Sequence, residues 1–144
     1  MANGLSPTEA ATLQNGYSVM SNQPKSVVHA APAIDMQVIE TLQAELAVVA
    51  PGLMAELIEL FLTNTPDVLM KMRQAIAQDD ADTLKTCAHT LKSNCARLGA
   101  SICSRICLNL EMMGQNGHLD GGDEKLAELE LEYERVEQSL RKMV

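Results

Sequence analysis

The chain has 144 residues, of which 47% are hydrophobic and only 2% aromatic, and its formal net charge is −8. This acidic balance argues against a nucleic-acid backbone or an anionic membrane as the main partner, because both require a basic surface. With so few aromatic residues, the core must be built from Leu, Ile, Val, Met and Ala, most of which favour helices over strands. We therefore expect an all-α protein that docks with other proteins.

The sequence carries no signal for insertion into a membrane or for secretion. No apolar run approaches the ~18 residues that a transmembrane helix needs, and no basic region followed by an apolar one begins the chain. The four cysteines, Cys87, Cys95, Cys103 and Cys107, fall in predicted helices without a Cys-x-x-Cys pair or a suitably spaced histidine. We expect them to be reduced core thiols rather than metal ligands, and we expect a cytoplasmic protein.

Residues 1–33 are predicted to form a flexible N-terminal tail or linker, because Asn, Ser, Gln, Pro and Gly are interspersed there without a sustained hydrophobic period. Within this segment, Ser6, Pro7 and Glu9 have the pattern of a helix start. His29 has no partner in sequence and is interpreted as a solvated loop residue.

The first half of the remaining segment, 34–144, is expected to hold three helices. Asp35 is a suitable N-cap for a first helix that ends at Pro51-Gly52. A second helix is expected over residues 53–64. Thr65-Pro66 is expected to end it and to begin a third helix over residues 66–78, because proline suits the first position of a helix.

Three further helices are expected in the second half. A central helix over 80–98 is capped by Asp79 or Asp80 and is ended by Gly99. The other two cover 101–113 and 123–142.

A glycine-rich loop that contains His118, to which we assign no role, joins the last two helices. The final helix has a narrow apolar seam opposite an acidic, solvated face. Six helices with short connections predict an antiparallel four-helix bundle, with two additional N-terminal helices packed across one end.

The central helix is the most informative part of the chain. At about 100° per residue, one side of it is a continuous apolar stripe, made by Leu84, Cys87, Ala88, Leu91, Cys95 and Leu98. His89 lies opposite the middle of that stripe, with Lys85, Lys92 and Ser93 one turn away. From spacing alone, an ordinary solvated histidine is the simpler interpretation.

The run Ala88-His-Thr-Leu-Lys-Ser-Asn-Cys-Ala-Arg-Leu-Gly-Ala100 resembles the histidine phosphotransfer (HPt) domain of bacterial multistep phosphorelays. That family usually has Ala-His-x-Leu-Lys-Gly, then small residues, then Leu-Gly-Ala. An Asp-Asp turn before the helix and a following helix that ends Asn-Leu-Glu extend the resemblance, which covers about 34–144. It implies an HPt-like helical bundle domain.

The resemblance also implies the roles of individual residues. His89 would accept the phosphoryl group, and Lys92 would help neutralise the phosphoryl oxygens. Ser93 stands where glycine is usual, so its hydroxyl would either crowd the partner or hydrogen-bond the imidazole or a phosphoryl oxygen. Lys85 would add electrostatic support, with an ordinary surface lysine as the equal alternative.

The resulting hypothesis is a phosphorelay intermediate that takes a phosphoryl group from a receiver-domain aspartate onto His89 and passes it to another receiver. It would not be an enzyme with kinase activity of its own, because nothing in the chain resembles an ATP site. It would need no cofactor of its own, since Mg²⁺ comes with the receiver. We expect a monomer whose partners are response-regulator receivers and a hybrid sensor histidine kinase. Two alternatives remain open, namely a stand-alone protein and the C-terminal part of such a kinase. The alternative is a noncatalytic helical adaptor or dimerisation module.

Overall fold

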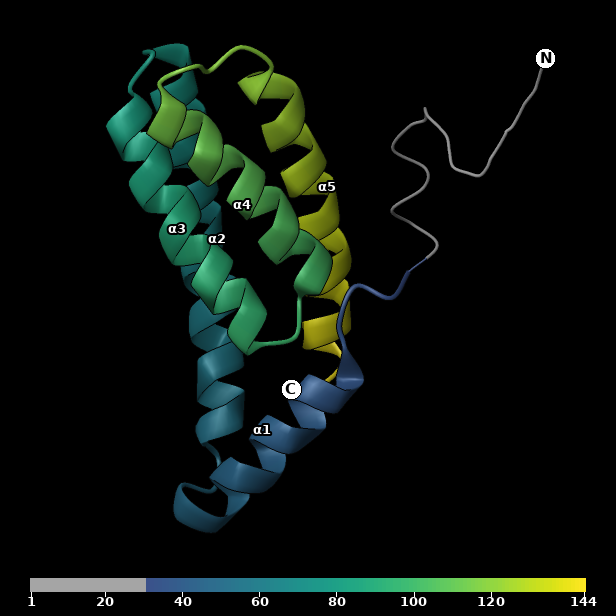
Figure 1. The fold of residues 1–144 in the computed structure, drawn as a ribbon. Coiled ribbons are helices and arrows are strands. Elements are labelled where there is room, and N and C mark those ends of the chain that lie inside the picture. Colours follow the sequence, from purple (N-terminus) through teal and green to yellow (C-terminus); the bar gives the residue numbers. More distant parts are fainter. Residues whose placement is uncertain (1–30) are drawn as a thin grey trace, which may run out of the picture. The chain divides into compact units, whose positions relative to one another are not determined.

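The computed structural model describes residues 31–144, and Ala33–Val144 forms one compact unit (Figure 1). This unit has five helices: α1 (Met36–Val49), α2 (Leu53–Ala77), α3 (Ala81–Arg97), α4 (Ser101–Asn116) and α5 (Gly122–Arg141). No strand occurs in the described part of the chain, so the all-α prediction is confirmed. The predicted tail up to residue 30, with the helix start at Ser6 and with His29, lies outside the described residues.

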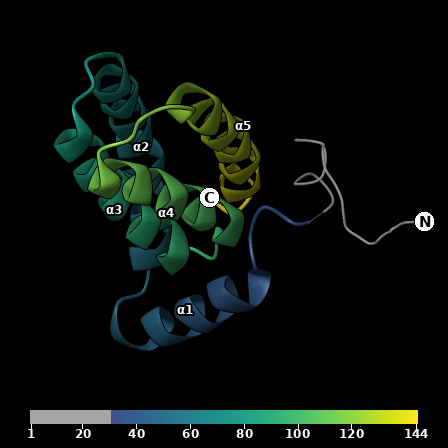
Figure 2. The same cartoon turned by 45° about the horizontal axis from the view of Figure 1, so that its top comes forward.

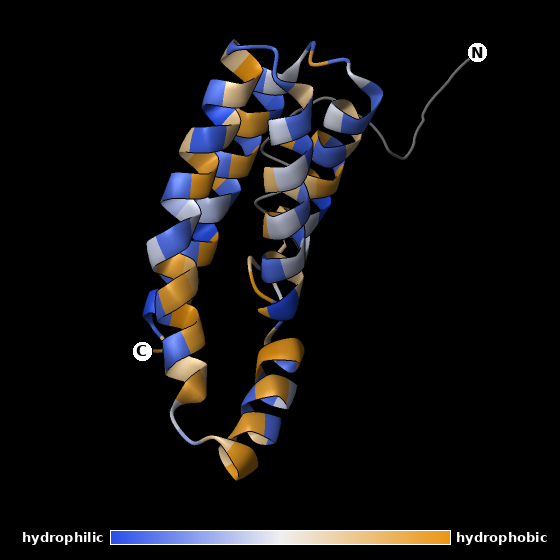
Figure 3. Ribbon diagram, turned by 90° about the vertical axis from the view of Figure 1, so that its left-hand side faces the viewer, coloured by the Kyte–Doolittle hydropathy of each residue, from blue (hydrophilic) through white to orange (hydrophobic). Residues whose placement is uncertain are grey.

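Helices α2 to α5 are the four walls of a bundle. α3 packs against α2 and α4, and α5 packs against the same two helices, so α3 and α5 occupy opposite corners (Figure 2). α1 crosses one end of the bundle (Figure 1). Polar and apolar residues occupy different sides of the helices (Figure 3), and the interior is aliphatic, with leucines at its centre: Leu84, Leu91, Leu110, Leu126, Leu129 and Leu140. The predicted four-helix bundle is therefore confirmed.

The predicted break at Thr65-Pro66 is wrong. The expected helices over 53–64 and 66–78 are one continuous helix, α2, with Pro66 inside it. Only α1 therefore crosses the end of the bundle.

Proline lacks the N–H that would donate to the carbonyl of Leu62 four residues earlier. In this fold the hydroxyl of Tyr133, from α5, donates to the Leu62 carbonyl at 3.5 Å. The Thr65 hydroxyl donates to the next carbonyl back, that of Phe61, at 2.6 Å. A hydrogen bond from another helix thus replaces the missing hydrogen bond within α2. The local sequence around Pro66 does not reveal this replacement.

The helix caps predicted at Asp35 and at Asp79 or Asp80 are confirmed, the second of them at Asp80, whereas Thr65 lies inside α2 and caps no helix. The Asp35 carboxylate accepts from the backbone N–H of Gln37 at 3.0 Å, and that of Asp80 accepts from the backbone N–H of Thr83 at 3.1 Å. The Thr83 hydroxyl also donates to the Asp80 carboxylate. The hydrogen bonds from the hydroxyl of Thr83 and, to a lesser extent, from its backbone N–H hold the pKa of Asp80 below its usual value. Asp80 thereby fixes the start of the helix that carries His89.

Gly99 joins α1 to the turn between α3 and α4. Its φ of +78° is in the left-handed region, as predicted for the residue that ends the central helix. Its carbonyl accepts from the Asp35 N–H at 2.8 Å, and a Cβ on Gly99 would lie 2.8 Å from the Asp35 oxygen. Any side chain here would push α1 away from the bundle.

Two small residues let α3 and α4 approach closely along their length. A Cβ on Gly114 would lie 2.7 Å from the carbonyl oxygen of Ala81 and 2.8 Å from the backbone nitrogen of Lys85. Nearer the other end of α4, the Ser104 hydroxyl donates to the carbonyl of Lys92 at 3.1 Å. Side chains of α4 between Ser104 and Gly114 on this side are therefore pressed against α3.

We predict that Gly114→Ala destabilises the protein, although alanine is the better helix former. The new methyl group would overlap the α3 backbone, and overpacking of this kind costs about 1–3 kcal/mol. Chemical denaturation would measure the loss, with Gln115→Ala at the exposed neighbouring position as the control. A Gly114→Ala variant as stable as the wild type would contradict the close approach.

Candidate functional site

The imidazole of His89 faces solvent from the middle of α3. Its side chain is 62% exposed, whereas Ala88 and Leu91 beside it are buried. Since the buried stripe of α3 anchors the helix, the ring is carried on a rigid support but is open to a partner. The exposed position predicted from the helical periodicity is thus what the structure shows.

A carboxylate from α4 contacts both His89 and Lys92. Oε2 of Glu111 lies 2.9 Å from Nδ1 of His89, and its Oε1 lies 2.7 Å from Nζ of Lys92. The Glu111 side chain is only 16% exposed, because it lies where α4 presses against α3. Lys92, chiefly, and His89 hold the pKa of Glu111 below its usual value, against the opposing effect of burial.

This contact favours one tautomer of the imidazole. An ionised carboxylate only accepts hydrogen bonds, so Nδ1 of a neutral His89 carries the proton and donates it to Glu111. The other ring nitrogen, Nε2, is left with its lone pair available. The site therefore presents one defined nucleophilic nitrogen at the surface.

Glu111 is the site residue that sequence reasoning did not select. It falls on the same side of α4 as Cys107, four residues before it, and Gly114, three residues after it, both of which are buried. The sequence signal that could have identified Glu111 is an acidic residue at a position that helical spacing places on the buried side of α4. Its partners depend on how α3 and α4 align, which the spacing within one helix does not give.

The two remaining predicted site residues lie on either side of His89. The Ser93 hydroxyl donates to the backbone carbonyl of His89 at 3.3 Å, so its contact is with the main chain of α3 and not with the imidazole. Lys85 is exposed one turn before His89, and it makes no ion pair with any residue from 31 to 144.

The site lies on the most cationic part of an acidic chain. α3 and α4 together carry four cationic side chains and only two carboxylates: Lys85, Lys92, Arg97, Arg105, Asp82 and Glu111. Helix α5, at the opposite corner from α3, is rich in glutamate. This distribution favours the approach of an anionic group to the α3–α4 face.

The three buried cysteines contribute no second reactive centre. Cys95, Cys103 and Cys107 are buried free thiols, and hydrogen bonding to the other two, followed by burial, raises the pKa of Cys95. Buried thiols of this kind are unreactive. Within residues 31–144, no three side chains of the metal-ligating types form a cluster, and no helix there is both long enough and apolar enough to cross a membrane.

Comparison with known proteins identifies the fold and the family. The model of the Hpt domain matches residues 56–139, which is more than half of the chain and includes His89, Lys92 and Glu111. The chain belongs to the Hpt domain family. No curated protein matches it.

Two solved structures have the same fold. Histidine-containing phosphotransfer protein B (HptB) from Pseudomonas aeruginosa PAO1 superposes with a TM-score of 0.70 at 24% identity, over 78% of this chain and 95% of HptB. The histidine-containing phosphotransfer protein ZmHP2 from maize gives a TM-score of 0.67 at 23% identity, over 82% of this chain and 94% of ZmHP2. This Hpt chain thus shares its helical bundle with proteins of both bacteria and plants.

We predict that Glu111 fixes the tautomer of His89. In the wild type at a pH where the ring is neutral, ¹⁵N NMR should show the Nδ1–H form as the main species. Glu111→Ala should raise the share of the Nε2–H form, because Nδ1 loses its acceptor. Glu111→Gln, whose amide oxygen still accepts, is the control and should stay close to the wild type. An unchanged tautomer ratio in Glu111→Ala would mean that this contact does not orient the ring.

Proposed function

We propose that this Hpt domain is a phosphorelay intermediate, which accepts a phosphoryl group from a receiver-domain aspartate onto His89 and passes it to a second receiver. The single observation that supports this most is the exposed imidazole whose Nδ1 is occupied by Glu111. Family membership adds the expectation of partners with receiver or kinase domains.

The proposed transfer uses the free nitrogen of His89. The lone pair of Nε2 attacks the phosphorus of the aspartyl phosphate in line with the bond to the carboxylate oxygen. The N–P bond forms, the P–O bond breaks, and the aspartate leaves as a carboxylate. The ring acquires positive charge while Nδ1 still holds its proton, and the carboxylate of Glu111 lies 2.9 Å away to compensate that charge. The reverse sequence delivers the phosphoryl group to the next receiver.

Lys92 is proposed to neutralise negative charge on the phosphoryl oxygens. Its ammonium group is on the same side of α3, one turn from His89, and Glu111 holds it there. The small side chain of Ser93 is proposed to leave room for the receiver next to His89. The unpaired positive charge of Lys85 is proposed to give electrostatic support to the phosphoryl group. These contributions stabilise charge that spreads over the phosphoryl group during transfer.

The proposal extends to catalytic activity, metal requirement, location and oligomeric state. We propose that it has no kinase activity of its own and that the receiver brings the Mg²⁺ required for transfer. We further propose that it acts in the cytoplasm as a monomer, either alone or as part of a hybrid sensor histidine kinase.

We predict that His89→Gln abolishes transfer. A purified receiver domain, labelled with phosphate on its aspartate, should label the wild type but not this variant, since glutamine offers no nucleophilic nitrogen. Helicity by circular dichroism should be unchanged, because the side chain is exposed. His118→Gln, which alters an exposed histidine in the α4–α5 loop, is the matched control and should be labelled like the wild type. Full labelling of His89→Gln would contradict the proposed function.

We predict that Lys92→Ala slows transfer on the order of tenfold, which corresponds to a loss of about 1.4 kcal/mol of charge stabilisation. The measurement is the single-turnover rate of transfer from a phosphorylated receiver, together with the lifetime of the phosphorylated form. Lys142→Ala removes an exposed lysine just beyond α5 and should change neither. If Lys92→Ala also changes neither, Lys92 does not act on the phosphoryl group.

A further inference from the structure

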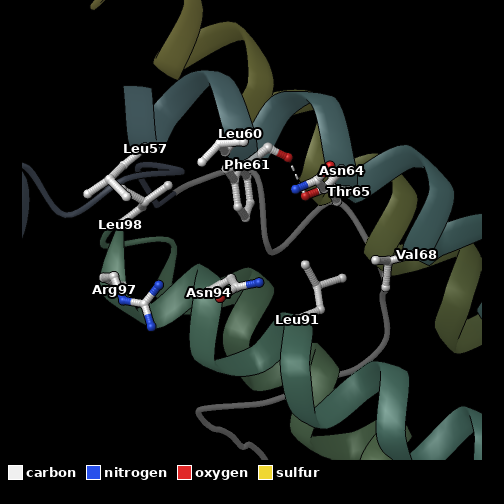
Figure 4. Close-up of a pocket in the computed structure, with 10 residues that line it drawn as sticks. All are labelled: Leu57, Leu60, Phe61, Asn64, Thr65, Val68, Leu91, Asn94, Arg97 and Leu98. Atoms are coloured by element: carbon white, nitrogen blue, oxygen red, sulfur yellow. Dashed lines mark hydrogen bonds between the residues drawn. The ribbon is translucent and has the colours of Figure 1, made fainter. Parts of the chain in front are cut away.

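His89 lies on the side of α3 that faces α4, since its imidazole contacts Glu111. The pocket between α2 and α3 is on a different side of that helix, and its α3 wall includes Leu91 and Asn94 (Figure 4). Asn94 is five residues beyond His89, which is about 140° around a helix with about 100° per residue. The surface next to the imidazole is therefore the one that α3 shares with α4.

Two large apolar side chains are exposed on α4 next to this surface. Leu108 is 40% exposed and Met112 is 53% exposed. Leu108 is one helical turn from Ser104 and one turn from Glu111, so these three side chains project from the same side of α4. Ser104 bonds to the backbone of α3 and Glu111 bonds to the imidazole of His89. Leu108 thus lies beside the site, and Met112 follows it one turn further along α4.

The charges around these two side chains are mainly positive. Arg105 is exposed on α4, three residues before Leu108, and it makes no ion pair with any residue from 31 to 144. Lys85 on α3 is exposed and is also unpaired within that range. The only carboxylate of α4 is that of Glu111, whose two oxygens already contact α3. We call Leu108, Met112 and Arg105 the α4 patch.

A protein that reaches the imidazole of His89 also covers the α4 patch. Glu111 approaches the ring to 2.9 Å, and Leu108 is three residues from Glu111, which is about 4.5 Å along the helix axis. A standard protein interface covers about 800 Å² per partner, or a patch roughly 30 Å across. Methionine is enriched in such interfaces, where its flexible side chain adapts to the partner. The exposed apolar pair is therefore placed where a partner buries it.

We infer that the α4 patch is a docking surface for the receiver that exchanges phosphate with His89, with Leu108 and Met112 buried against that receiver and Arg105 at the rim. The inference rests on the proposed function, which brings a receiver to the imidazole. A receiver that carries an aspartyl phosphate is anionic at the point of transfer, and the positive charges of α3 and α4 complement it. The patch selects among receivers without contributing an atom to the transfer itself.

The test uses the double variant Leu108→Ala/Met112→Gln, which removes apolar surface without adding charge. Both replacements are good helix formers at exposed positions, so α4 is retained. Met70→Gln is the matched control. Met70 is 60% exposed on α2, one turn before Arg73, whose partner Glu130 is on α5, and so it lies away from the α3–α4 face.

A panel of purified receiver domains is phosphorylated with acetyl phosphate and Mg²⁺, and the initial rate of transfer is measured over a range of concentrations of this protein. Phosphoramidate, a small donor that needs no docking surface, is used in parallel. The double variant should raise the concentration for half-maximal transfer about tenfold, with little change in the maximal rate and with normal labelling by phosphoramidate. Met70→Gln should match the wild type in every assay.

Three results would overturn the docking inference and leave the proposed function standing: an unchanged half-maximal concentration in the double variant, an equal shift in Met70→Gln, or a loss of phosphoramidate labelling in the double variant. So would a wild type that sediments as a dimer beside a double variant that sediments as a monomer, because a second copy of the chain would then occupy the patch. If no receiver labels the wild type although phosphoramidate does, the proposed function itself fails.

Discussion

The site depends on one carboxylate that lies between two helices. Glu111 reaches across from α4 to Nδ1 of His89 and to the ammonium group of Lys92 on α3. It can do so only because α3 and α4 run very close together, with Gly114 against the α3 backbone and Ser104 bonded to it. The packing of the bundle and the chemistry of its surface are thus connected through a single side chain.

Glu111 contributes more to the orientation of His89 and Lys92 than to the free energy of unfolding. Ion pairs that solvent can reach contribute little to the free energy of unfolding, with a median near 0–1 kcal/mol. The same contacts hold one proton on Nδ1 and keep the Lys92 ammonium group close to the ring.

Patterns confined to one helix could be predicted from the sequence. The apolar stripe of α3 correctly placed His89 outside the core, and Asp35, Asp80 and Gly99 mark helix ends because their side chains or backbone freedom act within a few residues. Features that join two helices could not be predicted in this way. Tyr133 donates a hydrogen bond to the Leu62 carbonyl that Pro66 leaves free, in a helix α2 that is continuous where a break was expected. Glu111 was missed for the same reason, since its partners are 22 and 19 positions away on another helix.

The central claim is that Glu111 reserves Nδ1 of His89 for a proton and leaves Nε2 for phosphate. The most direct measurement is NMR of the phosphorylated protein, with ¹⁵N-labelled histidine and ³¹P detection, which identifies the ring nitrogen bonded to phosphorus. The account predicts phosphate on Nε2 of His89, with a proton on Nδ1. Phosphate on Nδ1, or on His118, would contradict it.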